Sequence, residues 1–571
     1  MHEYGGGAYF VDGETLFFSD FQSQRIHRLD PGTEPRPITP EPLIPSGLRY
    51  ADGHTSPTGT SIVLVRETHA DGAEATNDIV LMSADGTLPA RSIVSGNDFY
   101  SFPRFSPDGE KLFWTAWDHP QMPWDGCQLW VGDITADGSV ENTRLIAGGP
   151  RESIFQPEWG LDGSIYFVSD RSGWWNLYVE RDGATTAISP MEAEFGCPQW
   201  VFGLSRYGFL GDRIAALHTR DGFDFVSIID PESGEVRELD LPYTSISWLA
   251  TDGRDGLALI ASSPSRAPEV VLADVVSGQL DVVRQGLELD VDPGYLSRPV
   301  HIEFPTTGDR TAYAFFYPPV NKDHEPADHR PPLIVTSHGG PTDSTSSGLK
   351  LSIQFWTSRG FGVVDVNYRG STGYGRAYRE RLEGQWGIVD TDDCLNAAGY
   401  LSERGDVDPK RMAIRGKSAS GYTTLSALVF HDVFAAGASY YGVADLEGLA
   451  TDTHKFESRY LDGLIGPYPE ASSVYAERSP IEHAEQLSTP VILLQGLDDK
   501  VVPPAQAEVM AGVLREKGLP FAHITFPGEQ HGFIQAANIQ RALEVELYFY
   551  SRVFGFVPAD EIDPITIENL T

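Results

Sequence analysis

Three residues that could act together lie far apart in the sequence, and each follows an apolar run. Ser418 sits in RMAIRGKSASGY, a pattern typical of a strand, a sharp turn and a helix. Asp499 follows the run VILLQG, and His531 lies in ITFPGEQHGF, shortly after the apolar run ITF. A serine hydroxyl becomes a good nucleophile when a histidine accepts its proton and a carboxylate orients that histidine. This set predicts attack on an amide carbonyl and an acyl-enzyme intermediate.

The serine segment departs from the usual pattern of such turns. A glycine is expected two residues after the nucleophile, but Ser420 stands there and Gly421 comes one residue later. Taken alone, the segment fits a helix N-cap as well as a nucleophile turn. The chain order serine, aspartate, histidine favours the second interpretation, because it is the order of the α/β-hydrolase fold. Asp498 also follows the strand, and we choose Asp499 as the orienting carboxylate.

The segment SHGGPT could supply part of an oxyanion hole. Attack on a carbonyl places negative charge on its oxygen, which fixed backbone N–H groups can stabilise. Gly340, with Gly339 beside it, would present one such group without obstruction, and Ala419 after the nucleophile would present the other. His338 is then expected to be structural. The alternative is that HGGP is only a flexible turn.

The elements that would position these residues occupy the second half of the chain. After residue 288, short apolar runs such as PLIVTS, FGVVDVN and TPVILLQ alternate with helical stretches such as AQAEVMAGVLREKG. Strands that are apolar on both faces imply a buried, mainly parallel sheet with helices on both sides. We therefore expect a doubly wound α/β-hydrolase domain over residues 289–571, with its chemistry at the carboxyl ends of the strands.

The first half repeats a different unit. An apolar strand, an Asp-Gly or Pro-Asp-Gly turn and another alternating strand recur at roughly 40–50 residues, as in SFPRFSPDGEKLFWTAWD. Such spacing is typical of β-propeller blades, whereas a β-sandwich gives no reason for the repeated order. We predict a propeller of six to seven blades over residues 1–288.

Composition excludes some functions. The chain has 571 residues, enough for at least two domains, and its 42 basic and 81 acidic residues give a net charge of −39. That charge disfavours nucleic acid and anionic membranes as partners. Its three cysteines lack metal-ligand spacing, so we expect no metal site. There is no signal-peptide pattern or long apolar span, so the sequence predicts a cytoplasmic protein with no membrane contact.

Motifs along nearly the whole chain resemble the prolyl oligopeptidase (S9) serine peptidases, in particular the bacterial dipeptidyl aminopeptidase and acylaminoacyl-peptidase-like branch. They include HEYGGGAY, AWDHPQMPWDG, SDRSGWWNLY, HGGPT, NYRGSTGYGR, QGLDDKVVPP and GEQHGF. The resemblance implies that Ser418, Asp499 and His531 form a triad, that the propeller restricts access to short peptides or aminoacyl amides, and that no metal or organic cofactor is needed. Relatives carry further residues before HEYGGG, so the resemblance implies that the propeller lacks an N-terminal part. Open strand edges would then invite homo-oligomers.

Substrate contacts and competence are less directly predicted. In aminopeptidase-like relatives acidic side chains of the propeller can hold a substrate amine, so Glu152 and Glu158 are candidates, although both could be solvated carboxylates. Tyr441 could line the pocket. The altered turn with Ser420 and Lys417 leaves two alternatives, a repurposed amide hydrolase or acyltransferase and a binding protein without activity.

Overall fold

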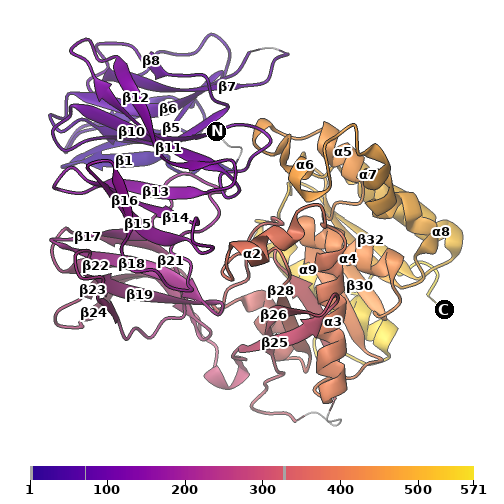
Figure 1. Cartoon of the computed structure of the whole chain (residues 1–571). Helices are drawn as coiled ribbons and strands as arrows, with labels where there is room; N and C mark the ends of the chain where they lie inside the picture. Colours follow the sequence, from indigo (N-terminus) through magenta and orange to yellow (C-terminus); the bar gives the residue numbers. More distant parts are fainter. Residues whose placement is uncertain (1–3, 71, 326–329, 571) are drawn as a thin grey trace.

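The computed structural model describes residues 4–70, 72–325 and 330–570, which form two lobes (Figure 1). The first lobe ends with strand β24 at Gln285, and the sheet of the second lobe begins with β25 at Val300.

The described part of the first lobe contains six four-stranded antiparallel sheets, each built from consecutive strands. Their bounds are β1 (Tyr9–Asp12), β2 (Thr15–Ser19), β3 (Ile26–Leu29) and β4 (Arg36–Pro37); β5 (Leu48–Thr55), β6 (Ser61–Thr68), β7 (Thr76–Ser83) and β8 (Arg91–Val94); β9 (Phe99–Phe105), β10 (Lys111–Trp117), β11 (Cys127–Ile134) and β12 (Val140–Gly149); β13 (Ile154–Trp159), β14 (Ile165–Ser169), β15 (Asn176–Arg181) and β16 (Ala184–Ala187); β17 (Tyr207–Leu210), β18 (Arg213–Arg220), β19 (Phe223–Ile229) and β20 (Val236–Glu238); β21 (Ser245–Thr251), β22 (Gly256–Ser263), β23 (Arg266–Asp274) and β24 (Leu280–Gln285).

Strand patterning and turn chemistry explain these sheets. In β23 exposed and buried residues alternate along the whole strand, as expected when one face packs against the neighbouring sheet. The Pro-Asp-Gly turn between β9 and β10 places Gly109 at a φ of 76°, a conformation that glycine adopts without strain. Aromatic contacts join successive sheets, such as Phe113 of β10 stacked on Trp159 of β13. The predicted propeller is thereby confirmed, and its six sheets fall within the expected six to seven blades.

The second lobe is built on one eight-stranded sheet of order β25-β26-β28-β27-β29-β30-β31-β32. Its first three strands pair antiparallel and the others pair parallel, which confirms the predicted mainly parallel sheet. Its strands and helices are β25 (Val300–Thr306), β26 (Arg310–Tyr317), β27 (Leu333–Ser337), α1 (Leu351–Thr357), β28 (Gly362–Asn367), α2 (Arg376–Arg379), α3 (Val389–Arg404), β29 (Met412–Lys417), α4 (Ala419–Phe430), β30 (Ala436–Tyr440), α5 (Leu446–Thr451), α6 (Tyr460–Leu464), α7 (Ser472–Arg478), β31 (Val491–Gly496), α8 (Pro504–Lys517), β32 (Phe521–Phe526) and α9 (Ala536–Phe554), with short 3-10 turns at Pro293–Tyr295, Glu380–Leu382, Lys455–Glu457 and Pro480–Gln486.

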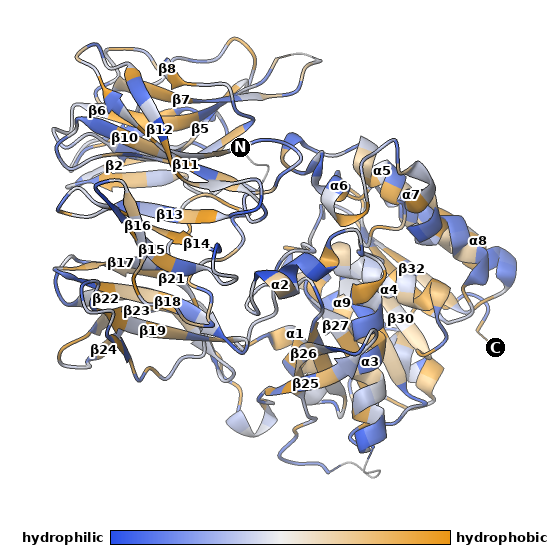
Figure 2. Ribbon diagram, in the orientation of Figure 1, coloured by the Kyte–Doolittle hydropathy of each residue, from blue (hydrophilic) through white to orange (hydrophobic). Residues whose placement is uncertain are grey.

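Helices cover both faces of this sheet, as in a doubly wound fold. Buried residues of α3, α4 and α8 share one apolar cluster, and those of α1 and α9 share another. Figure 2 shows hydrophobic colours concentrated along the strands of both lobes and hydrophilic colours along α8. The sheet is therefore buried between two helical layers, and its carboxyl edge is left for the loops that follow the strands.

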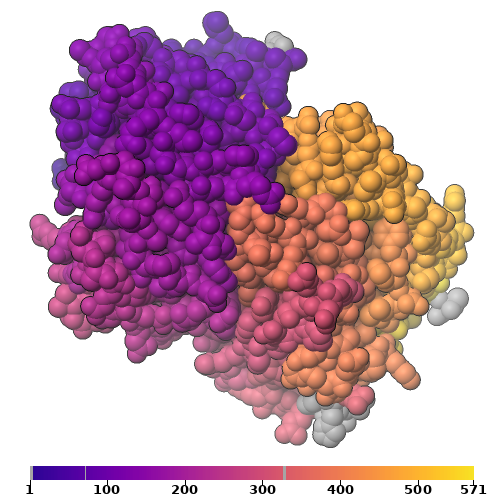
Figure 3. All heavy atoms as spheres, viewed as in Figure 1, coloured from indigo at the N-terminus to yellow at the C-terminus, as the bar shows by residue number. Residues whose placement is uncertain are grey.

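The two lobes are in direct contact (Figure 3), and part of the contact is aromatic. Trp124 of the propeller lies 5.7 Å from Tyr460, and Trp200 lies 6.1 Å from Phe456, measured between ring centroids.

The described residues contain no helix long and apolar enough to cross a membrane.

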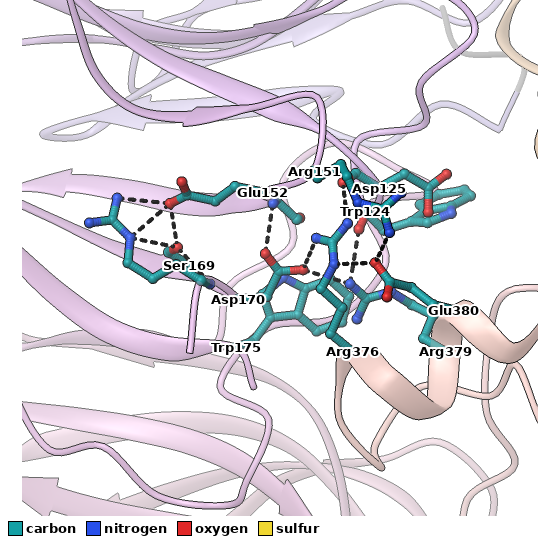
Figure 4. A network of polar contacts seen from close by, with 12 residues as sticks. Trp124, Asp125, Arg151, Glu152, Ser169, Asp170, Trp175, Arg376, Arg379 and Glu380 are labelled. Atoms are coloured by element: carbon teal, nitrogen blue, oxygen red, sulfur yellow. Dashed lines mark hydrogen bonds and ion pairs between the residues drawn. The ribbon is translucent and has the colours of Figure 1, made fainter. Parts of the chain in front are cut away.

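A buried ion-pair cluster adds to the contact between the lobes (Figure 4). Asp170 follows β14 of the propeller, and its Oδ2 accepts hydrogen bonds from Arg376 Nη1 at 2.7 Å and from Arg379 Nη2 at 2.6 Å, both on α2 of the second lobe. Its Oδ1 accepts the N–H of Ser153. The Asp170 side chain is fully buried, so one carboxylate of the propeller forms ion pairs with two guanidinium groups of the second lobe, one of which, Arg376, also pairs with Glu380.

Candidate active site

The turn that carries Ser418 joins β29 to α4 and is strained. Ser418 has a φ of 52° and a ψ of −122°, which is unfavourable for a residue with a side chain. The neighbours must be small: a Cβ at Gly416 would lie 2.0 Å from the carbonyl oxygen of Ser420, and one at Gly421 would lie 2.5 Å from Gly442 Cα. These close approaches explain the glycines of the segment, and the strained turn presents the hydroxyl at the sheet edge.

Ser418, His531 and Asp499 form a continuous hydrogen-bond chain. Ser418 Oγ lies 2.7 Å from His531 Nε2, and His531 Nδ1 lies 2.9 Å from Asp499 Oδ2. The other carboxylate oxygen of Asp499 accepts the N–H groups of Val501 and Val502, each at 2.9 Å. Because both of its oxygens are engaged and it is buried, Asp499 is held in one orientation toward the imidazole.

The structure brings the three predicted catalytic residues together from the ends of three different strands. They follow β29, β31 and β32, which lie in one sheet with parallel pairing, so their carboxyl ends meet at one edge. Asp498 is exposed, whereas Asp499 points to the imidazole.

A residue that the sequence analysis did not single out supports the histidine loop. The buried carboxylate of Glu529 accepts hydrogen bonds from the backbone N–H groups of Ile534 and Gln535 and from the Asn538 side chain, at 2.8–3.0 Å. Glu529 precedes His531 and all three donors follow it, so these hydrogen bonds close the loop that carries the histidine. The motif GEQHGF placed an acid two residues before the histidine, and that spacing was the available signal.

Ser420 fits the turn without disturbing it. Its Oγ accepts the N–H of Lys417 at 2.8 Å and donates to the carbonyl of Lys417 at 2.9 Å. The hydroxyl that takes the place of the usual glycine therefore bridges the strand end and the first turn of α4. Lys417 itself lines the cavity beside Ser418, and burial, with the charge of Arg415, lowers the pKa of its ammonium to about 8.

The residues predicted for the oxyanion hole lie beside the nucleophile. Gly340 and Ala419 both line the cavity that contains Ser418. As the first residue of α4, Ala419 has a backbone N–H outside the helical hydrogen-bond ladder. His338 is partly buried, stacks on Tyr368 and lies 2.6 Å from Ser371 Oγ through Nε2, and desolvation of its ring lowers its pKa to about 4. These contacts fit a structural role for His338.

The cavity around Ser418 has a volume of about 680 Å³ and walls from both lobes. The propeller lobe contributes Tyr4, Trp200 and Val201, and the second lobe contributes Tyr441 and Glu457 among others. Tyr441, predicted as a pocket residue, packs edge-on against His531 with 5.1 Å between ring centroids.

The two glutamates predicted to hold a substrate amine lie elsewhere in the described structure. Glu152 pairs with Arg171 at 2.8 Å and accepts the Ser169 hydroxyl at 2.6 Å. Glu158 lies beside Gln156, and burial raises its pKa. Neither is among the residues that line the cavity of Ser418. Within the described ranges, no group of three or more His, Cys, Asp or Glu side chains is arranged to hold a metal ion.

Comparison with known proteins places this site in context. The profile described as the prolyl oligopeptidase family matches residues 347–556. The fold of the whole chain superposes on a puromycin-hydrolysing peptidase of Mycobacterium tuberculosis with a TM-score of 0.94 and 42% identity, covering 100% of this chain and 89% of that one. A puromycin hydrolase matches with a TM-score of 0.93 and 39% identity, over 99% of this chain and 89% of that one.

One curated relative matches over a shorter segment. Dipeptidyl aminopeptidase BIII of Pseudoxanthomonas mexicana is 31% identical over 235 residues, which are 40% of this chain and 34% of that protein. The match therefore spans about a third of the length of that relative. With the two-lobed fold and the site described above, the extent and identity of the structural matches establish that the chain belongs to the prolyl oligopeptidase family of serine peptidases.

Proposed function

We propose that this protein is a serine peptidase that hydrolyses short peptides or aminoacyl amides through an acyl-enzyme on Ser418. The observation that carries the proposal is the hydrogen-bond chain from Ser418 through His531 to Asp499, at 2.7 and 2.9 Å. The puromycin-hydrolysing relatives support the same class of reaction, since both proteins are named for the hydrolysis of puromycin.

The geometry supports a two-step mechanism. His531 Nε2 takes the proton of the Ser418 hydroxyl while Oγ attacks the carbonyl carbon, and the N–H groups of Gly340 and Ala419 stabilise the oxyanion. The protonated imidazole then gives that proton to the leaving amine as the C–N bond breaks. Water, deprotonated by His531, attacks the acyl-enzyme and releases the acid, which regenerates Ser418. Asp499 stabilises the imidazolium in both steps.

We further propose that residues 289–571 form the catalytic domain and residues 1–288 a domain that limits access. The cavity supports this division, because Trp200 of the propeller and Ser418 of the second lobe line the same space. A cavity of about 680 Å³ with walls from both lobes favours a short peptide over a folded chain as the substrate. A homo-oligomeric state and a cytoplasmic location stay predictions.

Labelling with a fluorophosphonate probe and turnover of aminoacyl and N-acylated p-nitroanilides test the function. Wild type should label and cleave, Ser418→Ala should lose both by at least about 10³-fold, and Ser473→Ala, an exposed serine of α7, should behave as wild type. Absence of labelling in wild type would refute the proposal and favour a binding protein. Products that incorporate an added amine in preference to water would favour an acyltransferase.

A further inference from the structure

One carboxylate of the cavity has no role in the mechanism above. Glu457 ends a 3-10 turn (Lys455–Glu457) of the second lobe and lines the cavity together with Ser418 and His531. Only 13% of its side chain is exposed. Its Oε1 accepts the hydroxyl of Tyr4 at 2.9 Å, and its Oε2 lies 3.4 Å from His454 Nε2. The acid is thus held in place from two sides.

The charge of Glu457 is poorly compensated by the protein. Among the described residues no lysine or arginine forms an ion pair with it, and a buried carboxylate without a permanent cation is costly. Burial raises its pKa to about 7, against the lowering effects of the Tyr4 hydrogen bond and of positive charge on His531. Within the described part of the chain, the titratable groups that face it are Tyr4, His454, His531 and Tyr460. A cation supplied from outside would restore the balance.

Aromatic rings beside Glu457 would favour a cation at the same position. The ring of Tyr4 stands edge-on to Trp200, with 5.5 Å between centroids, and both line the cavity. Trp200 is held by a hydrogen bond from its indole N–H to the carbonyl of Thr342 at 2.8 Å. Fixed aromatic rings next to a carboxylate bind ammonium groups through their negative faces as well as through the charge pair.

We propose that Glu457, with Tyr4 and Trp200, binds the free α-ammonium group of the substrate and makes the site selective for peptides with an unblocked N-terminus. This inference rests on the proposed function and names its substrate class. It also moves the amine site from the propeller, where Glu152 and Glu158 were expected to provide it, to the second lobe.

The test compares substrates that differ only in the amine. Values of kcat/KM are measured for alanine p-nitroanilide and N-acetylalanine p-nitroanilide with wild type, Glu457→Gln and, as a matched control, Glu470→Gln, an exposed glutamate outside the cavity. Glu457→Gln should lower kcat/KM for the free amine by roughly 100-fold, with less than about a threefold effect on the acetylated substrate. Fluorophosphonate labelling, which needs no amine, should be unchanged.

Equal losses on both substrates, no loss on either, or a wild-type preference for the acetylated substrate would overturn the inference. A binding arm separates this failure from failure of the proposed function. In the Ser418→Ala background, calorimetry should show that trialanine binds roughly 100-fold more tightly than N-acetyltrialanine, and that added Glu457→Gln removes the difference. Equal binding of the two peptides would refute the amine site even if wild type proved inactive.

Discussion

Replacing Asp170 by asparagine should weaken the contact between the two lobes strongly. The substitution keeps the shape of the side chain but removes the charge shared by Arg376 and Arg379. Arg376 retains Glu380 at 2.6 Å as a second anion, whereas Arg379, whose side chain is 4% exposed, loses its ion-pair partner among the described residues. What remains for Arg379 is the Trp124 carbonyl, the face of Trp175 and the charges of the nearby Asp125 and the buried Glu194, neither of which forms a direct ion pair with it.

The size of the effect follows from that burial. Removing one partner of a buried ion pair costs about 3–5 kcal/mol, because the other charge stays buried without its direct partner, and the charges of Asp125 and Glu194 place Arg379 toward the lower end of that range. That free energy corresponds to a factor of roughly 10² to 4 × 10³ in the equilibrium between joined and separated lobes. The exposed pair of Lys111 and Asp133 in the propeller offers a matched control, since screening by water makes such pairs contribute little.

Equilibrium unfolding in urea, followed by tryptophan fluorescence, measures the difference. Trp124 and Trp175 lie at the cluster and should report its opening (Figure 4). We expect Asp170→Asn to lower the midpoint of the transition well beyond Asp133→Asn, and an added Arg379→Met to recover part of the loss because it removes the stranded cation. A shift no larger than that of Asp133→Asn would refute the reasoning.

Three further predictions concern the cavity. Ser420→Gly should lower turnover and the free energy of unfolding, the latter by about 1–2 kcal/mol, because it removes two hydrogen bonds within the turn; increased turnover of alanine p-nitroanilide would contradict this. Lys417 lines the cavity beside Ser418 and, with a pKa of about 8, carries a positive charge below that pH, which should favour a substrate with a free C-terminal carboxylate. The ratio of kcat/KM for dialanine to that for its C-terminal amide should therefore fall above pH 8; a constant ratio, or a fall that persists in Lys417→Met, would count against it. Glu457, with a pKa of about 7, loses its charge below that pH, so kcat/KM for alanine p-nitroanilide relative to its N-acetyl form should fall up to tenfold per pH unit, and Glu457→Gln should give a flat ratio.

The fold and the triad could be predicted because their signals are local. Most parallel strands of the α/β lobe contain a short apolar run, and Ser418, Asp499 and His531 each follow such a run. Chain order and the parallel sheet then place them at one edge without further information. The blade repeats are similarly visible, because the turn after every strand is specified by neighbouring residues.

The interface and the amine site could not be predicted, because their partners are distant in sequence and lie on irregular segments. Asp170 and Arg379 are 209 positions apart, and Tyr4 and Glu457 are 453 apart. No periodicity links such pairs. The expectation that Glu152 would face the substrate rested on the resemblance alone, whereas the nearby Arg171 satisfies its charge within the propeller.

The catalytic residues and the residues that select the substrate are held by different parts of the fold. The triad is fixed by the strand ends of one buried sheet, so its geometry changes only if that sheet is rearranged. The residues that would select the substrate lie outside the strands of both lobes; they are Tyr4, Trp200 and Glu457. Substitutions there can alter which peptides bind while Ser418 keeps its geometry. A contact such as that of Asp170, which holds the lobes together, therefore also holds the two walls of the cavity in register.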